Sequence, residues 1–277
     1  MKKLSAFYEK IILFLSSIPQ VNKRNHDKYW GKLYDFILQD LSTNIDQSWE
    51  NIYNHEFNYQ EEINFIDNNI SHKTTFKNYL KIQKNKILNN FKKITDHHDI
   101  DLILDLGSGW GRNSITLSKT YPSTKIIAGE FSTSGRKITQ FLIKKYKLNI
   151  ESIKFDWNNP ENIISEINRK QPKAIIIFSN CSIEQIPILS PILFHECLKL
   201  NIKVFGIHNE PVKWQINSEN KPFKENYNEN FIRLLKTFES SKQIELNKFE
   251  EGYFGHSVSK VSKNCTLIQY NNLKYLE

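Results

Sequence analysis

Short apolar runs alternate with segments of helical spacing from about residue 99 onward. An apolar run without polar alternation is typical of a strand that is buried on both faces of a sheet. The strands expected on this basis are 102–106, 125–129, 150–155, 174–178 and 203–207. Helices are expected from Arg112 and over 131–148, 162–170, 192–198 and 231–238. Strands that alternate with helices predict a doubly wound, mostly parallel sheet.

Two further strands are expected at 244–249 and 266–270, joined by a loop that contains Gly252, Tyr253, Gly255 and His256. As an antiparallel pair they would complete a sheet of seven strands. Residues 1–98 show helical spacing, beginning with an amphipathic segment that ends near Pro19. We therefore expect an α/β protein with a helical N-terminal cap over 1–98 and a sheet domain over 99–277.

The expected strand 102–106 leads directly into three glycines, Gly107, Gly109 and Gly111. A strand, a glycine turn and a helix in succession bring backbone N–H groups and a helix N-terminus close to a ligand. A dinucleotide fingerprint would need its third glycine at position 112, where this chain has Arg112. An acidic residue, Asp105, comes two positions before the first glycine.

Composition narrows the class of protein. The chain has 277 residues and a formal net charge of +8, but its lysines are dispersed along the whole sequence. Nucleic-acid readers usually concentrate basic residues, arginine among them, on one face, so a nucleic acid is not the expected partner. Three cysteines in no metal-like spacing predict a reducing compartment, no disulfide framework and no metal site. No stretch approaches the ~20 apolar residues of a membrane span, and we expect a cytoplasmic protein.

The Asp-x-Gly-x-Gly-x-Gly pattern from Asp105 to Gly111 resembles motif I of the class I methyltransferases that depend on S-adenosylmethionine (SAM). The resemblance covers roughly residues 99–277 and implies a Rossmann-like sheet and SAM as the cofactor. It also implies cofactor contacts from the glycine loop and the ends of the next strands. The residues concerned are Asp105, Gly107, Ser108, Gly109, Gly111, Arg112, Asn113, Glu130, Phe131, Asp156, Trp157 and Asn180.

Three of these positions also suit the physical role that the resemblance implies for them. Glu130 comes 19 positions after Gly111, at the end of an expected strand, where a carboxylate can accept both ribose hydroxyls. Asp156 and Trp157 follow the third expected strand. In the family, that loop commonly offers an acidic side chain to the adenine amino group and packs its next residue against the ring.

Candidate catalytic and acceptor-binding residues follow the fourth and fifth strands. His208 and Glu210 form the best general-base pair in the sequence, and Glu184 is a further candidate. Gln185 and Trp214 are candidate acceptor contacts. Because such methyltransferases commonly place additions over the mouth of the active site, Tyr29 and Trp30 are also expected to contact the acceptor. Cys181 is expected to be a packing residue, because direct methyl displacement needs no nucleophilic cysteine.

The sequence thus predicts methyl transfer to an oxygen or nitrogen of a small polar acceptor, such as a sugar, a specialised metabolite or a peptide side chain. An RNA methyltransferase remains an alternative that the basic charge permits. A non-catalytic adenosyl-binding or scaffold protein on the same fold is a second alternative, because a fold does not determine a function. An NAD-dependent oxidoreductase is disfavoured by the glycine spacing.

Overall fold

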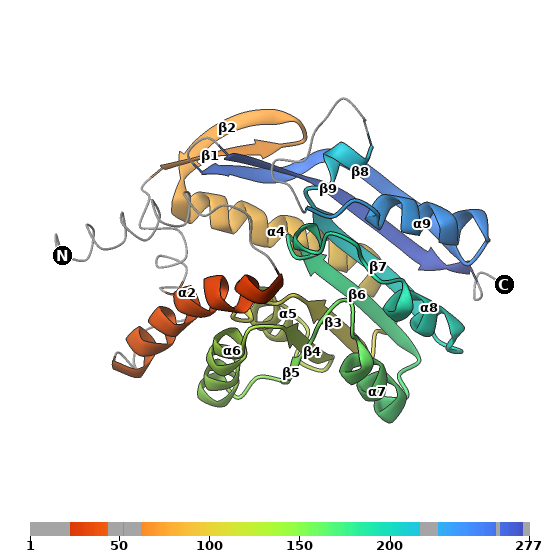
Figure 1. The fold of residues 1–277 in the computed structure, drawn as a ribbon, viewed down its shortest axis with the longest axis horizontal. Helices are drawn as coiled ribbons and strands as arrows, with labels where there is room; N and C mark the ends of the chain where they lie inside the picture. Colours follow the sequence, from red (N-terminus) through yellow and green to blue (C-terminus); the bar gives the residue numbers. More distant parts are fainter. Residues whose placement is uncertain (1–22, 44–51, 53–61, 217–226, 259–260, 274–277) are drawn as a thin grey trace.

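The computed structural model describes residues 23–43, 52, 62–216, 227–258 and 261–273. These residues form one mixed sheet with helices on both faces (Figure 1). The strand order is β2-β1-β8-β9-β7-β6-β3-β4-β5. The strands are β1 (Glu62–Asp67), β2 (Ile70–Thr75), β3 (Leu102–Leu106), β4 (Lys125–Glu130), β5 (Ile150–Lys154), β6 (Ala174–Asn180), β7 (Lys203–Glu210), β8 (Ile244–Val258) and β9 (Val261–Asn272).

Seven of these strands form the sheet that the sequence predicts. The strands β5, β4, β3, β6 and β7 are parallel, and their carboxyl ends lie along one edge. Strand β9 runs antiparallel to both β7 and β8, which gives the expected closing pair. Successive side chains of β3 point to opposite faces of the sheet, so Ile103 packs into one core cluster and Leu104 into the other. The strand is therefore buried on both faces.

The prediction of seven strands and a wholly helical N-terminal part is wrong over residues 62–75. Strands β1 and β2 form an antiparallel hairpin there, and β1 pairs with β8, so the sheet has nine strands. Ile63 and Phe65 alternate into the core, and the turn residues Asn68 and Asn69 adopt φ values of 51° and 65°. Asparagine tolerates this left-handed conformation better than most residues, which favours a tight hairpin turn.

The last two strands are also longer than expected. Strand β8 continues through Gly252–His256, the segment predicted as a loop, and pairs there with β9. Register shifts at Leu246/Lys248 and Glu250/Phe254 mark irregularities in the ladder. Gly252, with φ of 66°, lies in the second of these, and a β-bulge lets a strand absorb such a residue without ending.

Seven α-helices complete the described part of the fold. They are α2 (Lys23–Thr43), α4 (Phe76–Thr95), α5 (Arg112–Thr120), α6 (Thr133–Tyr146), α7 (Glu161–Lys170), α8 (Ile192–Lys199) and α9 (Phe231–Ser240). Residues of α2, α4, α5 and α6 share one core cluster, and residues of α7, α8 and α9 share the other. No described helix has the length and apolar character to span a membrane. The N-terminal amphipathic segment predicted from the sequence lies outside the described residues.

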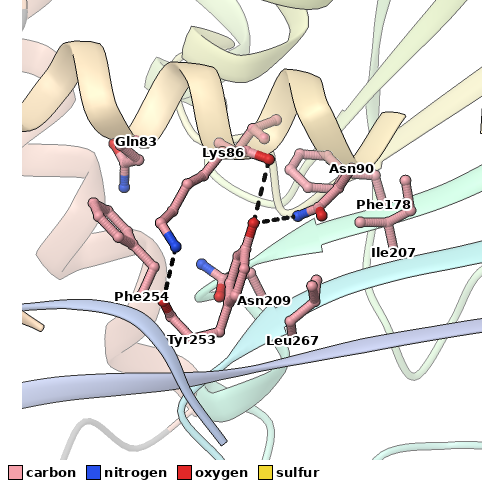
Figure 2. Close-up of a pocket in the computed structure, with 10 residues that line it drawn as sticks. Gln83, Lys86, Asn90, Phe178, Ile207, Asn209, Tyr253, Phe254 and Leu267 are labelled. Atoms are coloured by element: carbon pink, nitrogen blue, oxygen red, sulfur yellow. Dashed lines mark hydrogen bonds between the residues drawn. The ribbon is translucent and has the colours of Figure 1, made fainter. Parts of the chain in front are cut away.

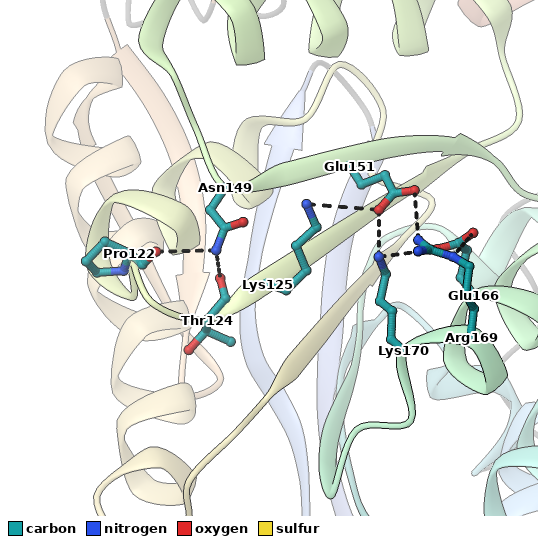
Figure 3. Close-up of polar contacts among 8 residues, drawn as sticks. All are labelled: Pro122, Thr124, Lys125, Asn149, Glu151, Glu166, Arg169 and Lys170. Carbon is teal, nitrogen blue, oxygen red and sulfur yellow. Dashed lines mark hydrogen bonds and ion pairs between the residues drawn. The ribbon is translucent and has the colours of Figure 1, made fainter.

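Polar contacts fix the outer strand β5 to α7 (Figure 3). The Glu151 carboxylate contacts Lys170 at 2.8 Å, and Glu166 pairs with Arg169 at 2.5 Å. Asn149, just before β5, donates from its amide to the carbonyl oxygen of Thr124 at 3.2 Å. These groups are partly exposed, so each ion pair contributes at most about 1 kcal/mol to stability.

Candidate functional site

The glycine loop lies at the carboxyl end of β3 and leads into α5. Gly107, Gly109 and Gly111 have φ values of 76°, 60° and 87°, a region that residues with a side chain rarely adopt. The N–H groups of Gly107 and Ser108 donate to the carbonyl oxygen of Gly129 at 2.8 and 3.0 Å. The loop therefore turns sharply after β3, as the sequence predicts, and the structure adds that it is tied to the end of β4.

Two neighbouring elements approach this loop so closely that its glycines cannot carry side chains. A Cβ atom on Gly107 would lie 2.3 Å from Cβ of Ser182, and one on Gly109 would lie 2.8 Å from the hydroxyl oxygen of Tyr34. The Ser182 hydroxyl also donates to the carbonyl oxygen of Leu106 at 2.9 Å. The loop is thus held between the segment after β6 and helix α2.

Glu130, at the carboxyl end of β4, points its carboxylate at this loop. Its two oxygens accept from the N–H groups of Gly109 and Ser132 at 2.9 and 2.8 Å. The residue is buried, yet each carboxylate oxygen can accept a second hydrogen bond. Glu130 therefore stabilises the loop and keeps acceptor capacity for a ligand that carries adjacent hydroxyl groups.

Asp105 occupies a more enclosed position than the sequence suggests. It is buried in β3 and accepts a hydrogen bond of 2.5 Å from the hydroxyl of Ser114 on α5. Burial raises the pKa of Asp105 to about 6, against the opposing effects of the Ser114 hydrogen bonds and the Arg112 charge. The observed contact of this carboxylate joins strand to helix beneath the loop.

Asp156 and Trp157 lie in the loop after β5, as expected, but their side chains have local partners. The Asp156 carboxylate accepts from the N–H group of Asn158 at 2.8 Å and from the amide of Asn159 at 2.9 Å. The indole of Trp157 is buried and stacks with Phe194 at a centroid distance of 6.2 Å. Their adenine contacts stay predictions, and in the described conformation these side chains stabilise the loop itself.

The remaining predicted cofactor residues lie around the loop at differing depths. Arg112 is buried and Asn113 is half-buried, both in the first turn of α5. Phe131 is half-buried directly after β4. Asn180, at the carboxyl end of β6, accepts a hydrogen bond of 2.8 Å from the amide of Asn209. This places an amide pair at the carboxyl ends of β6 and β7.

His208 lies in β7 and is fully buried among aromatic rings. Its Nδ1 is 2.8 Å from the hydroxyl of Ser179, and its ring lies against Phe231 and Tyr270. Burial lowers the pKa of His208 to about 3, so the imidazole is neutral throughout the physiological range. Its Nε2 is buried without a hydrogen-bond partner among the described residues. These surroundings are those of a core residue, and its role as a base stays a prediction.

Glu210, at the end of β7, organises the segment after β6. Its carboxylate accepts from the N–H groups of Ser182 and Glu184 at 3.1 and 3.3 Å. Burial, and then the charge of Glu184, raise the pKa of Glu210 to about 7. Two buried carboxyl groups therefore share the region next to the glycine loop, and near neutral pH one of them readily holds a proton.

The predicted acceptor contacts are more dispersed. Gln185 is half-buried after β6 and donates to the carbonyl oxygen of Cys181 at 3.2 Å. Trp214 follows β7, donates to the carbonyl oxygen of Asn228 at 2.8 Å and stacks on Tyr227. Tyr29 and Trp30 fall within α2, but their side chains lie outside the described residues.

A narrow cavity between α4 and the sheet is lined in part by Asn209 (Figure 2). The amide of Asn90 donates to the hydroxyl of Tyr253 at 3.0 Å, and the ammonium of Lys86 donates to the Tyr253 carbonyl oxygen at 3.3 Å. Burial raises the pKa of Tyr253 to about 12, which keeps its hydroxyl protonated. The Oδ1 of Asn209 is buried without a hydrogen-bond partner in the described part of the chain, so the cavity is lined by neutral polar groups as well as by the Lys86 ammonium.

Sequence reasoning missed the residues that approach the loop from outside. Tyr34 and Asp35 of α2 both reach the site region. The Tyr34 hydroxyl lies beside Gly109, and the Ser134 hydroxyl at the start of α6 donates to the Asp35 carboxylate. The helical spacing around Tyr34 revealed only that it would be buried. Ser182 was equally hidden, since a serine carries no signal that it will face a glycine far away in the sequence.

Comparisons with known proteins find similar structures but no similar sequence. No protein-family model and no curated protein matches the chain. Among solved structures, the chain is similar to a SAM-dependent methyltransferase from Aquifex aeolicus, at 18% identity and a TM-score of 0.43, over 69% of this chain and 89% of the other. It is also similar to an O-methyltransferase from Bacillus cereus in complex with S-adenosylhomocysteine (SAH), at 13% identity and a TM-score of 0.49, over 92% and 93%.

Proposed function

We propose that this protein is a SAM-dependent methyltransferase that acts on an oxygen or nitrogen of a small polar acceptor. The observation that carries the proposal is the hydrogen bond of 2.9 Å between Gly109 N–H and the Glu130 carboxylate. The bond holds a carboxylate, a suitable acceptor for ribose hydroxyls, against the backbone of a loop whose three glycines carry no side chains. Both features suit an adenosyl group.

The loop is better suited to an adenosyl ligand than to a dinucleotide. In a dinucleotide fold, the third glycine allows the helix to pack closely while its N-terminus faces a pyrophosphate. Here Arg112 occupies that position and is buried in the first turn of α5. Glu130 and the buried Asp105 also place negative charge around the loop, which disfavours a diphosphate and favours a cationic ligand.

SAM, when bound, would supply a methyl group that is already activated by a positively charged sulfur. The protein's task is then to position the acceptor and exclude water, and alignment alone can supply a large part of the rate. For a hydroxyl acceptor, Glu210 is the candidate base that we favour, because its pKa of about 7 suits proton transfer near neutral pH. Glu184 lies beside it as a second carboxyl group.

The acceptor class follows from the groups near the carboxyl ends of β6 and β7. Asn180 and Asn209 present side-chain amides at this edge of the sheet. The two amides are neutral donors and acceptors, which suit a ligand that carries hydroxyl or amide groups. This supports a sugar-like or amide-bearing acceptor.

Calorimetric titration with SAH tests the cofactor assignment without knowledge of the acceptor. We expect saturable binding with one site per chain, and no binding of NAD under the same conditions. NAD binding without SAH binding would contradict the proposal. If the RNA alternative holds instead, the protein will retain RNA with an affinity that falls steeply as salt is raised.

The base assignment needs a separate experiment. Once an acceptor is found, Glu210→Gln, which can still accept from the N–H group of Ser182, should lower turnover and leave the affinity for SAH nearly intact. His208→Ala, a substitution in the same strand, tests the other candidate base by the same two measurements. Full turnover in both variants would remove both residues from the role of base.

A further inference from the structure

Two cysteines that are distant in the sequence meet at the carboxyl edge of the sheet. The Sγ atoms of Cys181 and Cys265 lie 3.4 Å apart, and both residues are free thiols. Cys181 directly follows β6, and Cys265 in β9 precedes Thr266, which pairs with Glu210 at the end of β7. The two thiols therefore meet just beyond the strand ends that border the proposed active site.

We propose that Cys181 and Cys265 form a redox-active dithiol site that a peroxide converts to a disulfide, and that this bond weakens cofactor binding. Cys181 is half-buried, whereas Cys265 is buried, so Cys181 is the sulfur that a small oxidant reaches first. The hydrogen bond with Cys181, and then burial, hold the pKa of Cys265 well above its usual range, so Cys265 enters the reaction with its proton.

The chemistry proceeds in two balanced steps. The sulfur of Cys181 attacks one oxygen of hydrogen peroxide, the O–O bond breaks, and a sulfenic acid and water form. The sulfur of Cys265 then attacks the sulfur of Cys181, the S–O bond breaks, and the departing hydroxide takes the Cys265 proton and leaves as water. Each sulfur loses one electron, and the peroxide gains two.

The two sulfurs are close enough for the bond to form after a short movement. A disulfide needs the two sulfurs to approach by about 1.4 Å, down to a bond length of about 2.0 Å. Cys181 has a φ of 55°, which is uncommon for a residue with a side chain and directs its neighbours sharply away from β6. Its N–H group remains bonded to the carbonyl oxygen of Asn209 at 3.0 Å, which limits how freely the residue can move.

The disulfide is coupled to the cofactor site through Ser182, the next residue in the chain. Ser182 bonds the carbonyl oxygen of Leu106 at 2.9 Å and packs against Gly107, the first glycine of the loop. When Cys181 is drawn toward β9, Ser182 is displaced with it and no longer supports the glycine loop. This coupling rests on the proposed function, whereas formation of the disulfide does not.

The test uses the full-length protein, reduced or treated with stoichiometric hydrogen peroxide. We expect the oxidised protein to lose two hydrogen atoms in intact mass and to yield a Cys181–Cys265 peptide under non-reducing conditions. Cys197→Ser should behave in the same way, because Cys197 lies on the buried face of α8, where burial raises the pKa of its thiol to about 12. Cys181→Ser should show no loss of mass.

Affinity for SAH, measured by calorimetry before and after oxidation, tests the coupling. We expect it to fall about tenfold, the effect of one good hydrogen bond, and to recover with dithiothreitol. Unreacted thiols, or a Cys181 sulfinic acid without the crosslink, would overturn the dithiol site. A crosslink with unchanged affinity would overturn the coupling. A protein that forms the crosslink when oxidised, but does not bind SAH when reduced, would refute the proposed function and leave the dithiol site standing.

Discussion

Glu130→Gln is the substitution that most directly probes the proposed cofactor site. The side chain keeps its size, and one of its two oxygens becomes an NH2 group. In the wild type, the two oxygens accept from Gly109 and Ser132 at 2.9 and 2.8 Å. In the variant, one of these N–H groups must face the new NH2 group, which donates and cannot accept.

The expected magnitude is that of one hydrogen bond to a charged group. Such a bond contributes about 1.5–3 kcal/mol, so its removal should lower the free energy of unfolding by that amount. If Glu130 also accepts from the ribose, the variant has less acceptor capacity toward the ligand. A loss of about 1.4–2.8 kcal/mol in binding corresponds to a roughly 10- to 100-fold weaker affinity for SAH.

Two measurements separate these effects. Urea unfolding gives the loss of stability, and calorimetry at a temperature where the variant is folded gives the affinity for SAH. Glu151→Gln is the matched control, because its carboxylate belongs to the partly exposed polar network on β5. We expect this control to bind SAH like the wild type. Unchanged affinity in a folded Glu130→Gln protein would refute the assignment of Glu130 to the ribose.

Three further substitutions test other parts of the site. Gly107→Ala should destabilise the protein by about 2–4 kcal/mol in urea unfolding, because a φ of 76° is strained for alanine and the new Cβ would lie 2.3 Å from Cβ of Ser182. Adding Ser182→Gly should restore part of the lost stability. Wild-type stability of Gly107→Ala would contradict this packing. Tyr34→Phe should change the free energy of unfolding by less than about 1.5 kcal/mol and weaken SAH binding about three- to tenfold in calorimetry. Wild-type affinity for SAH would show that the Tyr34 hydroxyl of α2 has no part in cofactor binding. Glu210 has a folded pKa of about 7, raised above the ordinary 4.5 by burial and then by Glu184, so its contribution to stability is fully present below pH 4.5 and is lost as the pH rises through 7. The free energy of unfolding should therefore fall by about 2 kcal/mol more in the wild type than in Glu210→Gln between about pH 5 and about pH 8, and equal pH profiles would show that this carboxyl titrates normally.

The central strands were predictable because their sequences encode their burial. Ile103 and Leu104 point to opposite faces, so an unbroken apolar run can fit only a strand that is covered on both sides. The hairpin of β1 and β2 lacked such a signal. Ile63 and Phe65 face a core that β8 completes from the far end of the chain, and the turn at Asn68–Asn69 was the one local clue.

Backbone geometry at the site was easier to predict than side-chain direction. The turn at the glycines was predictable because other residues avoid these backbone conformations. The place of Glu130 was predictable because it ends a strand that follows the glycine loop at the expected distance. The direction of the Asp156 carboxylate is decided by local donors from Asn158 and Asn159, which no spacing rule contains. The contact between Cys181 and Cys265 depends on the strand order β6-β7-β9, which only the folded sheet supplies.

The β1–β2 hairpin also affects how the protein avoids aggregation. Without it, β8 would be an outer strand of a largely apolar sheet, and unpaired strand edges are templates for association between chains. The outermost strand is instead β2, which is mostly exposed and carries His72 and Lys73, the latter paired with Glu62 at 2.5 Å. A chain that lacks residues 62–75 would lose this polar border, and we expect it to aggregate more readily than the whole chain.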